Sequence, residues 1–346
     1  MPNPHLFCVA PMMDCTDRHD RYLLRLISRR TLLYTEMITT GALIHGDTAR
    51  LLAFDTSEHP LAPQIGGSEP RSMAACARLA QDHGFDEVNI NVGCPSERVR
   101  SGSFGACLMA EPELVAECVA AMRSACALPV TVKTRIGIDD RDSYEALAHF
   151  IATVAAAGCN TFAIHARKAW LKGLSPKQNR ELPPLRYDVA YRVKRDFPNL
   201  RIIVNGGIQS LSDARRHLRR LDGVMIGRAA YRDPYMLASV DQSIFGDAAP
   251  PLPREEVAKR MVEYTRRMCA QGLRPGAITR HMVGLFQGEP GARQWRRTLS
   301  EQAHRPGASA AVILAALEAR ADAAARAAQF RGSAGGPDVS SSQDAA

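Results

Sequence analysis

One cysteine of the sequence is placed where a thiol could do chemistry. Cys94 follows an apolar run and is held between Gly93 and Pro95. A thiol in such a place can act as a nucleophile or as a general acid. With an unperturbed pKa of about 8.5 it is mostly protonated at neutral pH and can donate a proton. Residues 96–110 after it contain two glycines, and we expect them to form a mobile loop near this thiol.

The other cysteines give no sign of a metal centre. All nine are scattered, their number is odd, and no two have the C-x-x-C spacing. That pattern argues against zinc, iron–sulfur clusters and a disulfide framework. We therefore expect no metal, and we interpret the remaining eight cysteines as small buried apolar residues.

Three further polar residues each end a different β-branched run: Gln64, Lys133 and His165. One cation and several hydrogen-bond donors aimed at one point would suit a ligand that gains negative charge, as a flavin does at N1/O2 on reduction. Taken singly, the histidine could instead be a hydrogen-bonded structural residue, and the lysine a buried ion-pair partner.

Two glycine motifs suggest a phosphate site. Asn205, Gly206 and Gly207 follow one apolar run, and Gly227 and Arg228 follow the next. Glycines let backbone N–H groups approach an anion closely, and the last two strand-to-helix loops of an eight-stranded barrel are its usual phosphate position. Ordinary glycine turns are the alternative, and the pairing of the two motifs favours phosphate.

The elements that must position these residues are short apolar runs alternating with amphipathic stretches. Helices are predicted at residues 71–83 and 112–126, among others. Such alternation indicates a parallel sheet, and eight units in about 230 residues favour an α/β fold of the (β/α)₈ TIM-barrel type. An open, doubly wound sheet would usually have fewer strands and a Gly-rich first turn. The predicted strands are residues 6–10, 32–37, 61–65, 87–92, 130–135, 161–164, 201–205 and 223–226.

The C-terminal third has a different pattern. A Pro-rich linker at 248–253 separates the barrel, residues 1–247, from an all-helical domain at 248–331, with helices expected at 254–271, 275–286 and 308–330. Residues 332–346 are rich in Gly, Ser, Asp and Ala, and we expect a disordered tail. The net charge of the chain is +8, and 14 Lys and Arg against 7 Asp and Glu lie within 250–331. This arginine excess suits phosphate recognition, although a solvated charged face is the commoner explanation.

Segments that direct a protein to a membrane are not evident. No stretch approaches the eighteen apolar residues of a membrane span, and the N-terminus lacks the basic and apolar regions of a signal peptide. We expect a cytoplasmic protein.

At these residues the chain resembles the flavin-dependent tRNA-dihydrouridine synthases, and within them the A-type members, which act on the tRNA D-loop. The resemblance extends from about residue 6 to about residue 330. The matching strings are VAPMMDCTDR (9–18), LYTEM (33–37), NINVGCPS (89–96), VKTRIG (132–137), HAR (165–167), NGGI (205–208) and VMIGR (224–228), and the A-type features are RKAWL (167–171), LSPK (174–177) and PGARQWRR (290–297).

The resemblance implies an FMN enzyme that takes a hydride from NADPH and reduces a D-loop uridine, at the expected positions 20 and 20a, to 5,6-dihydrouridine. It implies hydride delivery to uracil C6 and a proton from Cys94 to C5. We expect a monomer that binds tRNA and neither a metal nor a membrane. The residues that match the family's FMN contacts are Pro11, Met12, Met13, Gln64, Lys133, His165, Asn205, Gly206, Gly207, Gly227 and Arg228.

A polynucleotide substrate needs a phosphate-binding surface outside the pocket. The residues that we expect to contact tRNA are Asn91, Lys177, Arg180, Arg293, Arg296 and Arg297. Trp170 and Trp295 could stack on bases, although tryptophan is more often a packing anchor. Two other functions remain open on the sequence: a flavin barrel acting on a free pyrimidine, and an RNA-binding protein without chemistry.

Overall fold

The computed structural model describes residues 3–96 and 102–333. Residue contacts divide the chain into two units, Met1–Leu252 and Pro253–Ala346. The boundary between the units lies a few residues after 248, where the linker was expected to begin, because the chain leading up to the boundary packs on the first unit. Arg29 Nη2 lies 3.0 Å from Asp247 Oδ2, and Tyr235 donates to the Leu252 carbonyl at 2.8 Å.

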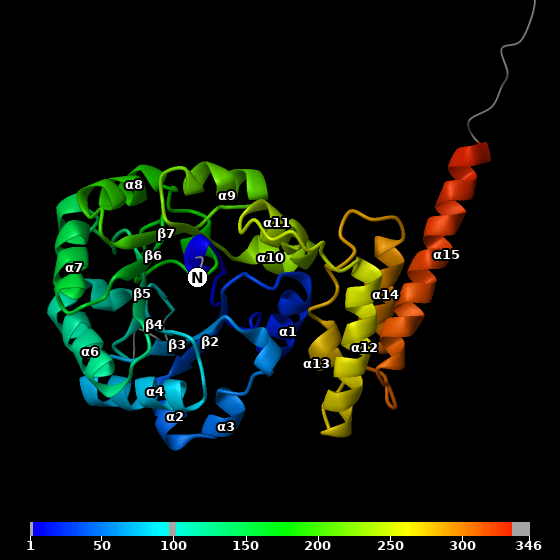
Figure 1. Ribbon diagram of the computed structural model, residues 1–346, viewed down its shortest axis with the longest axis horizontal. Helices are drawn as coiled ribbons and strands as arrows, with labels where there is room; N and C mark the ends of the chain where they lie inside the picture. The colour runs from blue at the N-terminus through cyan, green and yellow to red at the C-terminus, as the bar shows by residue number, and fades with distance from the viewer. Residues whose placement is uncertain (1–2, 97–101, 334–346) are drawn as a thin grey trace, which may run out of the picture. The chain divides into compact units, whose positions relative to one another are not determined.

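The first unit is a parallel eight-stranded barrel (Figure 1), which confirms the predicted fold class. The sheet runs β1-β8-β7-β6-β5-β4-β3-β2, and an isolated bridge between Cys8 and Leu32 joins its two ends. The strands are β1 (Phe7–Val9), β2 (Leu33–Thr39), β3 (Leu61–Gly66), β4 (Val88–Val92), β5 (Val130–Arg135), β6 (Thr161–His165), β7 (Arg201–Asn205) and β8 (Gly223–Ile226).

The strands are buried along nearly their whole length, as expected for a parallel sheet that is covered by helices outside and packed side chains inside. The barrel interior holds Cys8, Tyr34, Ala163, Ile203 and Met225, among others. The surrounding helices are α1 (Arg18–Ile27), α2 (Thr40–His45), α3 (Thr48–Leu51), α4 (Pro70–Asp82), α6 (Pro112–Ala125), α7 (Tyr144–Ala156), α8 (Tyr187–Asp196), α9 (Leu211–Leu218), α10 (Arg228–Arg232) and α11 (Val240–Ser243).

Short 3₁₀ helices occupy several connections of this unit. They are η1 (Pro4–Leu6), η2 (Thr56–Glu58), η3 (Gly105–Ala110), η4 (Gln178–Arg180) and η5 (Pro234–Ser239). Side-chain caps start many of the α-helices: Asp17, for example, accepts hydrogen bonds from His19 N and Asp20 N at the start of α1.

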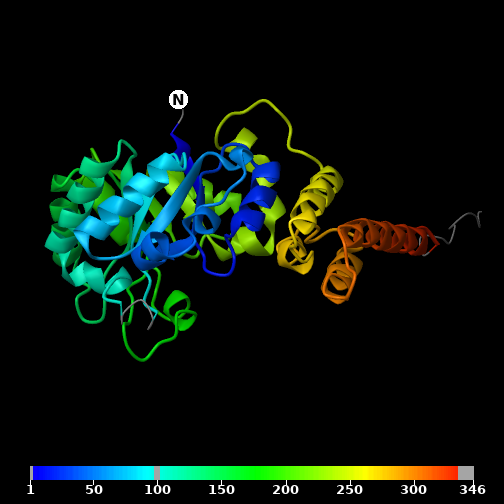
Figure 2. The same cartoon turned by 90° about the horizontal axis from the view of Figure 1, so that it is seen from below.

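The second unit is helical, and no strand occurs among its described residues (Figure 2). Its helices are α12 (Arg254–Ala270), α13 (Gly276–Thr279), α14 (Ala292–Gln302) and α15 (Ala311–Ser333). Trp295 is completely buried, packs with its ring centre 4.8 Å from that of Phe286, and donates from Nε1 to the Met282 carbonyl. Trp295 is therefore a packing anchor.

In this unit one helix prediction was wrong and one helix was not predicted. The helix predicted at 275–286 is only the four-residue α13, after which the chain continues in turns, such as Leu285 N to Met282 O at 3.0 Å. Helix α14 was not predicted, although Ala292, Trp295 and Leu299 are buried at helical spacing. In the described part of the chain no helix is long and apolar enough to cross a membrane.

Candidate active site

Polar side chains gather at the carboxyl ends of the central strands. Gln64 lies near the end of β3, the register pairs Asn91 on β4 with Lys133 on β5, and it pairs His165 on β6 with Asn205 on β7. The carboxyl ends of parallel strands meet at one end of a barrel. These five side chains therefore surround one region, which we call the mouth.

Amide side chains orient one another across the mouth. Gln64 Nε2 donates to Asn89 Oδ1 at 2.8 Å, and Asn91 Nδ2 donates to Gln64 Oε1 at 2.7 Å. Lys133 Nζ lies 3.1 Å from Asn205 Oδ1. Because buried amides with several partners have one preferred orientation, this network fixes which donors and acceptors face the mouth.

The side chain of Asn91 holds the backbone around Cys94. Asn91 Oδ1 accepts hydrogen bonds from Gly93 N at 3.1 Å and from Cys94 N at 3.0 Å. The Cys94 thiol is partly exposed and lies 3.5 Å from Ser96 Oγ. Beyond it, residues 97–101 of the predicted mobile loop lie outside the described residues. The described part of that loop includes Ala106, whose N–H donates to the Cys94 carbonyl at 2.9 Å.

Burial changes the proton affinity of the basic groups in the mouth. Burial, with a smaller contribution from the charge of Arg135, lowers the pKa of Lys133 to about 7. Burial also lowers the pKa of His165 well below its usual value, assisted by the charges of Arg135 and Lys133. At neutral pH His165 is therefore an uncharged imidazole, and Lys133 is close to its titration midpoint.

Glycine is required after β7. Gly206 and Gly207 have φ angles of 107° and 70°, which side chains other than glycine rarely adopt. A Cβ on Gly206 would lie 2.7 Å from the His165 ring, and one on Gly207 would lie 2.4 Å from Leu185. The predicted phosphate loop therefore brings bare backbone close to His165.

The second glycine motif is less constrained. A Cβ at Gly227 would lie 3.5 Å from Met12 Sδ, an ordinary contact distance. Arg228 begins α10, and its guanidinium is paired with Glu181 at 2.6 Å. An anion at this position would share Arg228 with that carboxylate.

The turn after β1 contains Pro11, Met12 and Met13. Met12 packs against the buried cluster inside the barrel, whereas Met13 is 53% exposed. A register shift in β2 between Tyr34 and Met37 places Glu36 beside this turn, and Asp14 N donates to Glu36 Oε1. Bulges of this kind are common next to active sites, where they redirect a side chain.

Sequence reasoning did not single out Arg135 as a site residue. Its guanidinium donates to the carbonyls of Gly93, Asn179 and Lys168 at 3.1, 2.9 and 3.3 Å. It thereby ties the Cys94 backbone to the chain that follows β6. The sequence signal that could have found it is its place at the end of β5, two residues beyond Lys133.

The residues expected to contact tRNA differ in exposure. Asn91 is buried in the mouth, whereas Lys177 and Arg180 are exposed near η4. In the second unit the expected contacts lie on the exposed face of α14: Arg293, Arg296 and Arg297. In residues 3–96 and 102–333 no group of three His, Cys, Asp or Glu side chains is arranged to hold a metal ion.

Comparison with solved structures supports the barrel. A complex of 2-naphthoyl-CoA reductase with 2-naphthoyl-CoA superposes with a TM-score of 0.52 over 68% of this chain and 50% of that chain. Its sequence identity is 13%, so the likeness concerns the fold alone.

Sequence comparison is more specific. A protein of Vibrio cholerae named tRNA-dihydrouridine(20/20a) synthase is 63% identical over 310 residues, which are 89% of this chain and 94% of that protein. A protein of the same name from Escherichia coli K12 is 59% identical over 317 residues, which are 91% of this chain and 92% of that protein. The dihydrouridine synthase (Dus) family model matches residues 8–325, a span that includes the whole mouth and α14. The chain therefore belongs to the dihydrouridine synthase family.

Proposed function

We propose that this protein reduces D-loop uridines of tRNA, at positions 20 and 20a, to 5,6-dihydrouridine, with FMN as cofactor and NADPH as reductant. The observation that carries the proposal is the position of Cys94, which Asn91 holds at the mouth beside Lys133 and His165 in a barrel of this family. The names of the relatives from V. cholerae and E. coli support the substrate and the two positions.

The residues of the mouth fit a flavin mononucleotide. The bare backbone at Gly206 and Gly207 suits its phosphate. Lys133, whose amine is largely desolvated, suits the part of the ring that gains negative charge. When bound, FMN would accept a hydride from NADPH and deliver it to uracil C6. The residues proposed to hold it are Pro11, Met12, Met13, Gln64, Lys133, His165, Asn205, Gly206, Gly207, Gly227 and Arg228.

Cys94 supplies the second half of the reaction. Its thiol gives a proton to C5 of the uracil, so one hydride and one proton complete the reduction of the C5=C6 bond. Lys133, Arg135 and Arg180 all interact electrostatically with Cys94. The thiolate that remains takes up a proton from solvent before the next turnover.

A uracil inside a folded tRNA must leave its stack to enter the mouth. Lys177 and Arg180 are exposed cations near the mouth, in the chain after β6, and we propose that they hold the RNA backbone there. Arg293, Arg296 and Arg297 on α14 supply further phosphate contacts from the second unit.

The first experiment is a visible spectrum of the purified protein, followed by addition of NADPH under anaerobic conditions and then of unmodified tRNA transcript. We expect flavin absorption that NADPH bleaches and tRNA restores, whereas free uridine restores it far more slowly. A colourless protein that FMN does not reconstitute would contradict the proposal. Equal rates with uridine and tRNA would instead support a free-pyrimidine enzyme.

The same assay separates the role of Cys94 from cofactor binding. Cys94→Ala should retain the flavin and its reduction by NADPH but lose about 10²–10⁴-fold in the rate of reoxidation by tRNA, the usual contribution of a general acid. Cys107→Ala is the matched control, because that thiol is also partly exposed but donates to the Phe104 carbonyl. Unchanged tRNA-dependent reoxidation in Cys94→Ala would exclude the thiol as the acid.

A further inference from the structure

The turn that contains Pro11, Met12 and Met13 is closed by one buried hydroxyl. Met12 N donates to Thr16 Oγ1 at 3.0 Å, and the same hydroxyl donates back to the Met12 carbonyl at 3.3 Å. That carbonyl also accepts from Thr16 N at 3.0 Å. The Met12 carbonyl has a further donor in Cys15 N at 3.1 Å, whereas the Met12 N–H donates to the completely buried Thr16 hydroxyl.

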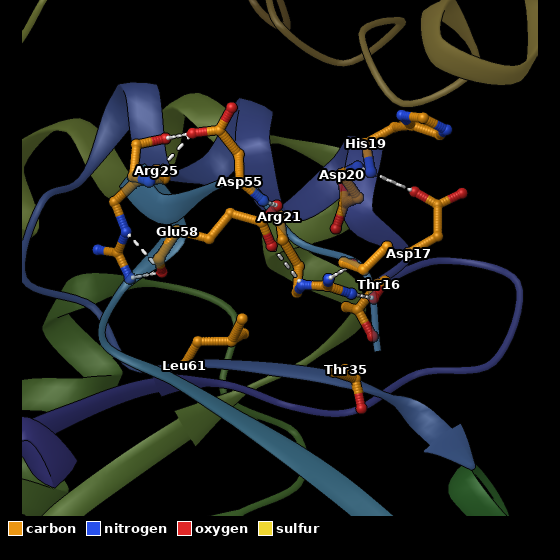
Figure 3. A network of polar contacts seen from close by, with 12 residues as sticks. Thr16, Asp17, His19, Asp20, Arg21, Arg25, Thr35, Asp55, Glu58 and Leu61 are labelled. Carbon is orange, nitrogen blue, oxygen red and sulfur yellow. Dashed lines mark hydrogen bonds and ion pairs between the residues drawn. The ribbon is translucent and has the colours of Figure 1, made fainter. Parts of the chain in front are cut away.

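Thr16 is held in turn by a buried ion pair behind it (Figure 3). Arg21 Nη1 donates to the Thr16 carbonyl at 3.0 Å, and Arg21 Nε donates to Glu58 Oε2 at 2.7 Å. A third hydrogen bond joins Arg21 Nη2 to the Ala53 carbonyl at 3.2 Å. Glu58 is fixed by η2, where its other carboxylate oxygen accepts from Asp55 N at 2.7 Å.

An ion pair in this location is not explained by stability alone. Arg21 and Glu58 are 4% and 0% exposed, and removing two charges from water costs about as much free energy as their attraction returns. The pair fixes the orientation of the Arg21 side chain, because a guanidinium with three partners has one orientation. The contacts lead without interruption from η2 through Arg21 and Thr16 to Met12.

We propose that Thr16 and Arg21 are positioning residues for the flavin site. They hold the turn after β1 in its binding conformation while neither is itself a proposed FMN contact. Met12 lies beside Gly227, the other end of the proposed cofactor site, so a displaced turn would disturb contacts from both β1 and β8. The inference rests on the proposed function, since it assumes that Met12 and its neighbours contact FMN.

The structure contains a matched control one turn further along α1. Arg25 is also buried, but its guanidinium donates to carbonyls outside the turn: those of Ser28, Thr31, Glu58 and Pro60. Figure 3 shows both arginines, each hydrogen-bonded to Glu58: Arg21 to its carboxylate and Arg25 to its backbone carbonyl. Replacing either arginine by lysine keeps the charge and removes a multi-partner guanidinium, but only Arg21→Lys releases Thr16.

FMN is removed from each full-length variant and titrated back to obtain the Kd for FMN. Urea unfolding of the FMN-free form measures the stability of the same variant. We expect Arg21→Lys to raise the Kd about tenfold, equivalent to about 1.4 kcal/mol. Arg25→Lys should stay within about twofold, although both variants lose comparable resistance to urea. Equal effects on Kd would show a merely structural role and overturn the proposal.

A second pair of variants keeps the test decisive if Arg21→Lys does not fold. Thr16→Val removes the hydroxyl at nearly constant volume, and Thr16→Ser keeps it. We expect weaker FMN binding in Thr16→Val and near-normal binding in Thr16→Ser, and wild-type affinity in Thr16→Val would refute the inference. Failure of the wild-type protein itself to bind FMN would overturn the proposed function as well, so the two failures are distinguishable.

Discussion

Two basic side chains on neighbouring strands lose much of their proton affinity in this barrel. Lys133 and His165 face the same mouth with Arg135 nearby, and burial together with mutual repulsion favours their neutral forms. A site of this kind is prepared for an anion, because a ligand that brings negative charge restores the proton on the amine. The cofactor and the protonation of Lys133 should therefore be linked.

FMN affinity should fall as the pH rises above 7. The pKa of Lys133 is about 7 in the free protein, and bound FMN, by favouring the charged amine, raises it. Above pH 7 binding therefore takes up a proton, and the affinity decreases by up to about tenfold per pH unit until the pKa of the complex is reached. Titrations from pH 7 to 9 check this, since a phosphate with a second pKa of about 6 does not change charge there.

Two substitutions of Lys133 test the origin of that slope. Lys133→Arg keeps a permanent charge, so its FMN affinity should be nearly independent of pH over this range. Lys133→Met should bind FMN more weakly, also without the slope. If Lys133→Met kept the wild-type pH dependence, another group would be responsible.

Sequence reasoning found the residues at strand ends but not the residues that support them. Lys133 and His165 could be identified because strand ends converge in any parallel barrel. The role of Arg21 could not, since its partner Glu58 lies 37 positions away. Arg135 likewise acts through backbone carbonyls, which have no signature in the sequence.

The chain after β6 is shaped by hydrogen bonds to a single buried amide. Asn179 is completely buried: its Oδ1 accepts from Trp170 N at 2.8 Å, and its Nδ2 donates to the carbonyls of Trp170 and Leu174. The loop also continues the sheet for a short distance through a parallel bridge between Ile138 and Ala169. The exposed cation Lys177 lies within this closed segment.

Asn179→Ala should loosen this segment without affecting the cofactor. The substitution leaves three backbone groups without their partner, at a cost of about 1–3 kcal/mol for a buried group. We expect faster tryptic cleavage at Lys172 and Lys177 and weaker tRNA binding, with an unchanged Kd for FMN. Gln178→Ala is the control, because its side chain is exposed and bonds only locally, to Ser175 N. Equal cleavage rates in the two variants would contradict this role.

At the scale of elements, burial patterns were more informative than local irregularities. The predicted strands at 130–135, 201–205 and 223–226 have the observed bounds, because each is a short run rich in β-branched residues that glycine or proline bounds on at least one side. The bulge in β2 was not predicted, since Thr35 stabilises it by accepting from Gln64 N on another strand. The tail was predicted to begin at residue 332, but residues 332 and 333 still belong to α15, which ends at Ser333.

At the scale of the whole molecule, the positive charge of the second unit is partly neutralised within it. Arg260 pairs with Glu256, Arg266 with Glu263 and Arg297 with Glu301. In contrast, Arg293 and Arg296 form no ion pair with any residue that the structure describes. Sequence composition gave the excess charge of the unit, but only the structure shows that Arg297, among the three proposed phosphate contacts on α14, would share its charge with a carboxylate.

The affinity for tRNA should therefore depend steeply on salt, and individual arginines should contribute unequally. If six or more cations meet phosphates, the affinity falls by about 10³-fold or more between 50 and 200 mM salt, because bound counterions are released. FMN binding, for which we propose the mouth of the barrel, should respond little. Arg296→Gln should reduce the slope of log Kd against log salt by about 1. Arg260→Gln removes the same charge from a paired, exposed position and should leave the slope nearly unchanged. A flat salt response of the wild-type protein would instead show that the second unit does not bind the tRNA backbone.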